Sequence, residues 1–140
     1  MQVKVMKLRK DVKIPAKNNS SDAGFDLFYY GTDPLELVPD KQFMVPTGCC
    51  IVIPDGFFGL IRPRSGYSVK YGTDTLAGVV DAGYTGEVSV VMTVEHRLVL
   101  QPGDKIAQML ILPVPDAEIV EILALPDTLR GADGYGSSGG

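Results

Sequence analysis

Five short segments contain residue types that can bind phosphate or move protons. In chain order they span residues 22–27 (DAGFDL), 63–66 (PRSG), 78–88 (GVVDAGYTGEV), 103–108 (GDKIAQ) and 130–140 (RGADGYGSSGG). Arginine offers a planar fork of donors that suits phosphate oxygens, and hydroxyl and backbone N–H groups can complete such a site. A carboxylate can act as a general base toward water. Each segment alone also fits tight-turn chemistry, because Gly beside Asp or Ser is typical of turns.

Other kinds of active site lack the residues they would need. The chain has one histidine, His96, and two adjacent cysteines, Cys49 and Cys50, so a zinc cluster would be short of ligands. A Ser-His-Asp triad would depend on His96, which follows a predicted strand within a charged stretch and is expected at the surface. Neither a P-loop nor a dinucleotide-binding glycine fingerprint is present. A phosphate-binding site in this chain would therefore have to be built from other residues.

The composition predicts a single soluble domain. With 140 residues, of which 45% are apolar and 21% charged, the chain can bury one core. The net charge of −4 argues against nucleic acid as a partner, although a single nucleotide needs only a few local cations. The longest aliphatic runs are about four residues, far below the roughly 20 that span a bilayer, so no membrane span is expected.

The two neighbouring cysteines indicate a location. Adjacent cysteines can bridge only through a strained ring, so Cys49 and Cys50 are predicted to be core fillers rather than a disulfide. This favours a reducing interior, namely the cytoplasm or, for a viral protein, the interior of the host cell.

The elements that must position these residues are predicted to be short β-strands. The 16 glycines and 10 prolines recur every few positions and leave no room for a long helix. Strands are predicted over residues 3–8, 35–38, 43–53, 59–62, 86–94 and 105–113. The one short helix is placed over residues 66–71, with the Ser65 hydroxyl as its cap. Alternation in the fifth strand predicts a core face that carries Val88, Val90, Met92 and Val94.

The last eleven residues permit two interpretations. They contain five glycines and cannot hold a fixed conformation without a partner. A disordered tail or an engineered scar would have this composition. An arginine and an aromatic residue among the glycines favour instead a lid that becomes ordered when a ligand binds.

Taken in order, the five segments resemble the five motifs of the trimeric deoxyuridine triphosphate nucleotidohydrolases (dUTPases), from about residue 22 to the end. The resemblance implies an all-β subunit, a distorted jelly roll or β-clip with one very short helix, that assembles as a homotrimer. It implies a β domain over residues 1–129 and a flexible glycine-rich lid over residues 130–140. The implied enzyme is a dUTP diphosphatase: water attacks the α-phosphate, and dUTP becomes dUMP and pyrophosphate. This would keep uracil out of DNA and supply dUMP for thymidylate synthesis.

In the family, the third motif forms a hairpin that receives uracil, here residues 76–81, a turn at residues 82–83, and residues 84–88. Backbone groups of Gly78, Val79 and Val80 can match the pairing edge of uracil. Cytosine would leave polar groups unpaired, at about 1–3 kcal/mol each. Tyr84 would pack under the sugar and exclude a ribose 2′-hydroxyl, unless it is a core tyrosine. Asp81 would bond the 3′-hydroxyl and orient the attacking water, unless it is only a turn carboxylate.

The other motifs imply residues around the phosphates. Gln108 would reach the phosphate and the catalytic water, and the remaining substrate contacts would come from Arg64, Ser65, Gly66, Thr75 and Ser89. From the tail, Arg130 would clamp the γ-phosphate, Tyr135 would stack on uracil, and the terminal phosphate would be wrapped by Gly136, Ser137 and Ser138. The alternative is that these polar residues only solvate turns and strand edges.

The implied cofactor is Mg²⁺ carried on the substrate triphosphate. Mg²⁺ prefers phosphate oxygens and waters, so Asp26 would be at most a water-mediated contact, and it could instead cap a turn. The sequence departs from the commoner family pattern at Lys105, Tyr135 and Ser138, which keep the charge, aromatic face and hydroxyl of arginine, phenylalanine and threonine. Asp133 replaces a frequent glycine, and its charge could repel the triphosphate.

Two other functions compete with this interpretation. A deoxycytidine triphosphate deaminase of the same fold carries a catalytic glutamate ten residues beyond the third-motif aspartate, but that position is Val91 here. A non-catalytic module could bind the nucleotide or a protein partner as a signal, but the intact Asp81 argues against it.

Overall fold

The computed structural model describes residues 1–137 and 139. Within these residues the chain forms ten strands and one short helix. In order they are β1 (Lys4–Lys7), β2 (Phe25–Phe28), β3 (Leu35–Leu37), β4 (Phe43–Val52), β5 (Phe57–Pro63), α1 (Ser65–Tyr71), β6 (Asp74–Leu76), β7 (Val79–Val80), β8 (Glu87–Thr93), β9 (Leu98–Leu100) and β10 (Lys105–Pro113).

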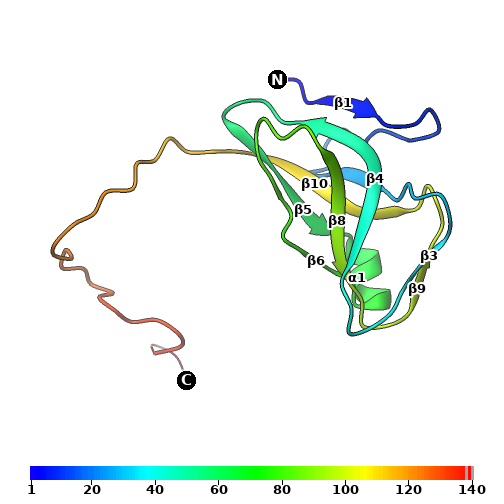
Figure 1. Cartoon of the computed structure of the whole chain (residues 1–140). Coiled ribbons are helices and arrows are strands. Elements are labelled where there is room, and N and C mark those ends of the chain that lie inside the picture. The colour runs from blue at the N-terminus through cyan, green and yellow to red at the C-terminus, as the bar shows by residue number, and fades with distance from the viewer. Residues whose placement is uncertain (138, 140) are drawn as a thin grey trace.

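The strands build two four-stranded sheets and a small two-stranded one, with antiparallel pairing throughout the described strands (Figure 1). One large sheet has the order β1-β4-β8-β6, the other has the order β2-β10-β5-β7, and β3 pairs with β9. Side chains from both large sheets, such as Met92 of β8 and Met109 of β10, meet in one core. The predicted all-β fold with one very short helix is confirmed.

The predicted core face of β8 is also confirmed. Its four members, Val88, Val90, Met92 and Val94, are all buried, while the residues between them are half-buried. Cys49 and Cys50 are free and buried, as expected of core fillers, and His96 is exposed. No helix in the described part of the chain is long and apolar enough to cross a bilayer.

The structure corrects two local predictions. The helix begins at Ser65 itself, Arg64 is its N-cap, and no side chain among the described residues makes a capping bond. The Ser65 hydroxyl is therefore not used as a cap. The predicted hairpin of residues 76–88 is not a regular one, because β6 pairs with β8 while β7 pairs with β5. Ala77 and Gly78, with φ of 55° and 90°, turn the chain from one sheet to the other.

After β10 the chain leaves the body and runs away from it as an arm (Figure 1). Apolar residues along this arm lie open to solvent, including Ile119 (96% exposed) and Leu123 (102%). Several exposed apolar side chains gathered along one segment are typical of a segment that packs against another molecule.

Candidate active site

A cavity of about 250 Å³ opens between β8 and the segment that carries β7. Ala77 to Asp81 contribute one wall, and Ser89 and Val91 of β8 contribute another. The wall of residues 77–81 is held from behind, because the Ile61 N–H of β5 donates to the Gly78 carbonyl at 2.8 Å. Since β7 pairs with β5 rather than with β8, the space between β7 and β8 stays open as a slot.

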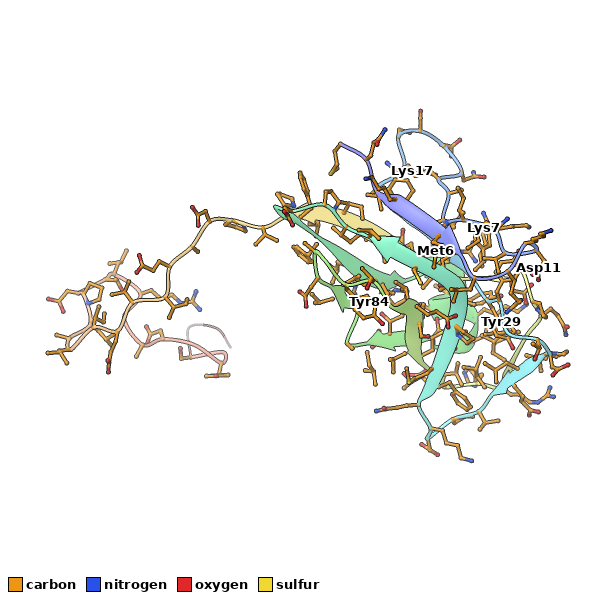
Figure 2. The ribbon with its side chains drawn as sticks, turned by 45° about the horizontal axis from the view of Figure 1, so that its top comes forward. Met6, Lys7, Asp11, Lys17, Tyr29 and Tyr84 are labelled. Carbon is orange, nitrogen blue, oxygen red and sulfur yellow. The ribbon has the colours of Figure 1, made fainter. Side chains whose placement is uncertain are left out.

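Asp81 and Tyr84 lie at the mouth of this slot. Both line the cavity, and both are exposed, Tyr84 by 47%. The alternative that Tyr84 is a core tyrosine is therefore wrong. Its hydroxyl donates to the Glu87 carbonyl at 3.0 Å. In the view of Figure 2, Tyr84 and the buried Tyr29 lie on either side of β4.

Six residues predicted to act on the base, the sugar or the attacking water line this slot: Gly78, Val79, Val80, Asp81, Tyr84 and Ser89. Thr75 does not line it. Its hydroxyl donates to the Ile61 carbonyl at 3.4 Å, which places Thr75 behind the wall formed by residues 77–81.

A second group of polar side chains gathers where β2, β10 and the start of α1 meet. The Lys105 ammonium lies 2.8 Å from one oxygen of Asp26, and the Arg64 Nε lies 3.7 Å from the other. The Arg64 guanidinium also donates to the Lys105 carbonyl at 3.4 Å and lies over the ring of Tyr67. Asp26 thus holds two cations side by side, which is a suitable arrangement for a phosphate chain.

Gln108 on β10 lies opposite Asp26 of β2 and Arg62 of β5. Its amide nitrogen donates to the Pro63 carbonyl at 3.1 Å, which leaves the amide oxygen as the acceptor for other groups. A Cβ atom on Gly24 would lie 2.5 Å from that oxygen and 3.0 Å from the Gln108 Cβ. Only glycine at position 24 therefore allows the amide to lie where it does.

The slot and the phosphate group do not meet within one chain. A shallow hollow beside the second group is lined by Ser65 and Gln108 together with Arg62, and no described residue lines both this hollow and the slot. The slot reaches Ile61, the residue before Arg62, and successive side chains of a strand point to opposite faces. The two groups thus lie on opposite faces of β5. Gly66 follows Ser65 in α1 and is exposed.

The predicted lid residues lie far along the arm. The Arg130 Nε donates to the Asp133 carbonyl at 2.9 Å, and Tyr135 is fully exposed with φ of 52°. The Ser137 N–H donates to the Gly134 carbonyl, and Gly136 has φ of 82°. Ser138, the last of the predicted phosphate contacts, lies outside the described residues.

A protein-held metal cluster and a cysteine nucleophile find no support among the described residues. No group of three or more His, Cys, Asp or Glu side chains gathers there to hold a metal ion. Burial in the core raises the pKa of the Cys49 thiol, as does the neighbouring Cys50. A cysteine nucleophile needs a lowered pKa, so Cys49 is a structural residue.

Two residues at the site were not predicted from sequence. Gly24 belongs to the first motif, where its residue type indicates no role, and its contact with Gln108 joins positions 84 residues apart. Glu87 lines the slot and receives the Tyr84 hydroxyl on its carbonyl. Its place within the third motif was the one available signal.

An all-β body with a narrow slot bounded by backbone and a separate cluster of cations and amides defines a class of small nucleotide-binding β proteins. The dUTPase family model matches residues 10–139. The deoxyuridine 5′-triphosphate nucleotidohydrolase of Rhizobium etli is 44% identical over 134 residues, covering 91% of this chain and 86% of that protein. The protein of the same description from Kluyveromyces lactis is 39% identical, with coverage of 98% and 93%. The chain belongs to the dUTPase family.

Solved structures share the fold of this chain. The dUTPase of Staphylococcus bacteriophage 80alpha, determined with dUPNHPP, superposes with a TM-score of 0.86 at 26% identity and covers 99% of this chain and 98% of that one. A mutant dUTPase from phage phi11, described with a structural Mg(II) ion, has the same fold, with a TM-score of 0.79 at 23% identity.

Proposed function

We propose that this protein hydrolyses dUTP to dUMP and pyrophosphate by attack of water on the α-phosphate. The observation that carries the proposal is the slot between β7 and β8, with Asp81 and Tyr84 at its mouth, in a chain of the dUTPase family. Such an activity lowers dUTP, which keeps uracil out of DNA, and supplies dUMP for thymidylate synthesis. We place it in the cytoplasm, or in the host-cell interior if the protein is viral.

The slot is the proposed base site. Its wall is a run of small residues, Gly78 to Val80, whose backbone groups can face the pairing edge of uracil. Tyr84 at the mouth would lie under the sugar, and Ser89 of β8 would support the base and sugar from within the slot, while Thr75 of β6 would support them from behind the wall. Asp81 would bond the 3′-hydroxyl and hold the attacking water as general base.

The cluster around Asp26 is the proposed phosphate site. Arg64 would offer its guanidinium, and the exposed Ser65 and Gly66 would offer hydroxyl and backbone N–H groups at the start of α1. Gln108 would use its amide oxygen, which is not engaged by Pro63, to orient the water. These groups position and neutralise the substrate, which is how most of the barrier to phosphoryl transfer is lowered.

A homotrimer with shared active sites would bring the two groups together. Within one chain they lie on opposite faces of β5, so the slot of one copy must meet the phosphate site of another. The exposed apolar residues of the arm also support contact between copies, because in a single isolated chain these side chains would remain in water. The arm leaves its own body (Figure 1), so it can also carry the tail of one copy to a site formed by two others.

Residues 130–140 are proposed as the lid on that site, with residues 1–129 as the β domain. Arg130 would clamp the γ-phosphate and Tyr135 would stack on uracil, while Gly136, Ser137 and Ser138 would enclose the terminal phosphate. Closure would exclude water other than the nucleophile and would strengthen the electrostatic interactions inside.

The residues present fit a metal ion that arrives with the substrate. Asp26 already balances Lys105 and Arg64, which suits a water-mediated contact better than direct ligation. Bound Mg²⁺ would neutralise charge on the triphosphate oxygens.

Deamination has no support from the slot. Val91, at the position of the deaminase glutamate, lines the cavity with an apolar side chain, and Glu87 is bonded to the Gly48 N–H through its carboxylate.

The decisive experiment is mass-spectrometric analysis of products from the four deoxynucleoside triphosphates and uridine triphosphate. We expect dUMP and pyrophosphate from dUTP alone; a bound but intact nucleotide would indicate a non-catalytic module instead.

Gly24→Ala is expected to lower kcat by about 10- to 100-fold with little change in thermal stability. The added Cβ would meet the end of the Gln108 side chain, which can move without unfolding the body but would then no longer reach the water. Steady-state kinetics and thermal denaturation measure the two effects. In a Gln108→Ala background the same change should cost no further activity, since coupled residues are not additive. An equal loss in both backgrounds would show that Gly24 does not act through Gln108.

A further inference from the structure

Glu87, the first residue of β8, makes two bonds in different directions. Its carbonyl accepts the Tyr84 hydroxyl at 3.0 Å, within the segment that forms the mouth of the slot. Its carboxylate accepts the backbone N–H of Gly48 at 2.9 Å, 39 residues away on β4. Glu87 therefore joins the tyrosine at the slot to the neighbouring strand of the sheet.

The partner of this carboxylate lies at an irregularity in β4. The β4–β8 register shifts between Pro46 and Cys50, so the regular ladder is interrupted there. A backbone N–H that leaves a ladder in a partly buried place needs another acceptor. The Glu87 carboxylate supplies one, and a charged acceptor makes a stronger bond than a neutral one.

A second bond fastens the same irregularity to the next residue of β8. The Thr47 hydroxyl donates to the Val88 carbonyl at 2.6 Å, and both residues are buried. Thr47 holds the strands together at Val88, one residue beyond the carbonyl that accepts the Tyr84 hydroxyl. Two side-chain hydrogen bonds thus hold β4 to the start of β8, and of Thr47 and Glu87 it is Glu87 that also bonds to the tyrosine.

The position of the Tyr84 side chain depends on this part of the backbone. A Cβ atom on Gly86 would clash with the Tyr84 hydroxyl oxygen, so the phenol group packs directly on residue 86 and bonds to the carbonyl of residue 87. Tyr84 is half-exposed, and its hydroxyl bond to Glu87 is the polar contact that holds the far end of the side chain. A shift at the start of β8 would carry the tyrosine with it.

We infer that Glu87 is a positioning residue for sugar selection: by holding the start of β8 to the β4 irregularity, its carboxylate keeps Tyr84 where a ribose 2′-hydroxyl would clash. This rests on the proposed role of Tyr84 under the sugar. Glu87 thereby acts on the discrimination between deoxyribose and ribose, which the hydrolytic step itself does not set.

The test compares dUMP and UMP binding by calorimetry to the whole chain in its native assembly, with wild type, Glu87→Ala, Glu87→Gln and Thr47→Val. The ratio of the Kd for UMP to the Kd for dUMP should fall by about tenfold in Glu87→Ala, roughly the scale of one hydrogen bond to a charged group. Glu87→Gln keeps an acceptor oxygen and should retain the ratio within about twofold. Thr47→Val should lower Tm but leave the ratio unchanged, because the Glu87–Gly48 bond stays in place and still holds the residue that contacts the tyrosine.

The binding ratio separates this inference from the proposed function. Absence of pyrophosphate release from dUTP by wild type would defeat the function, whatever the ratios are. An unchanged ratio in Glu87→Ala, or an equal fall in Thr47→Val, would overturn the positioning role of Glu87. A fall of the ratio in Glu87→Gln to the level seen in Glu87→Ala would also overturn it. The acceptor oxygen at position 87 would then not be the group that positions Tyr84.

Discussion

Asp81→Asn should reduce kcat by about 10²- to 10⁴-fold, the range typical of a lost general base, while binding of dUTP changes little. The amide is nearly isosteric and can still bond a 3′-hydroxyl, but it cannot take a proton from water. Asp81 lies exposed at the mouth of the slot and is not part of the core, so the substitution should leave Tm unchanged.

Single-turnover kinetics with excess enzyme would measure this effect without interference from product release. Asp116 offers a matched control, because it lines the depression on the far side of Asp81 and is also exposed. Asp116→Asn should keep nearly full activity. Near-normal turnover by Asp81→Asn, or an equal loss in both variants, would remove Asp81 from the proposed mechanism.

Deletion of residues 130–140 should have the second largest effect, a fall in kcat/KM of about 10²-fold or more. The deletion removes the Arg130 guanidinium and the cover that would exclude bulk water from the site. The hydrogen bonds recorded for Arg130, Asp133 and Ser137 all lie within the tail itself, so Tm should not change. A loss of activity at constant Tm would therefore result from the missing lid and not from unfolding of the body.

Two point substitutions in the tail sharpen this prediction. Tyr135→Phe keeps the aromatic face that would stack on uracil and should retain activity within about twofold. Asp133→Gly removes a carboxylate from the proposed lid and should lower KM, because that charge would face the triphosphate. Full activity after deletion of the tail would contradict the lid and favour the simple disordered tail.

Much of the fold could be predicted from local pattern. The strict alternation of residues 88–94 predicted the buried face of β8, and the frequency of Gly and Pro predicted short strands with one short helix. β2, β6 and β9 were not predicted, and β7 was expected only within the hairpin that the resemblance implied, because each is only two to four residues long. Such strands are set by their pairing partners rather than by their own sequence.

The parts of the site that depend on distant contacts could not be predicted. The pairing of β7 with β5 rather than with β8 follows from the turn at Ala77 and Gly78, and residue types alone do not reveal an alanine with positive φ. The Glu87–Gly48 bond exists because of a register shift in β4, which has no periodic signature. The motif order predicted the candidate residues, but their distribution over two faces of β5 emerged only from the structure.

The most direct test of the shared site is complementation between two inactive chains. Asp81→Asn chains retain Arg64 and the phosphate group, and Arg64→Ala chains retain the slot with Asp81. Co-refolded in equal amounts, they should form mixed trimers in which about one site in four combines two intact halves, restoring roughly a quarter of wild-type activity. If the mixture is no more active than the two variants refolded separately, the slot and the phosphate group do not meet between copies, and the account is wrong.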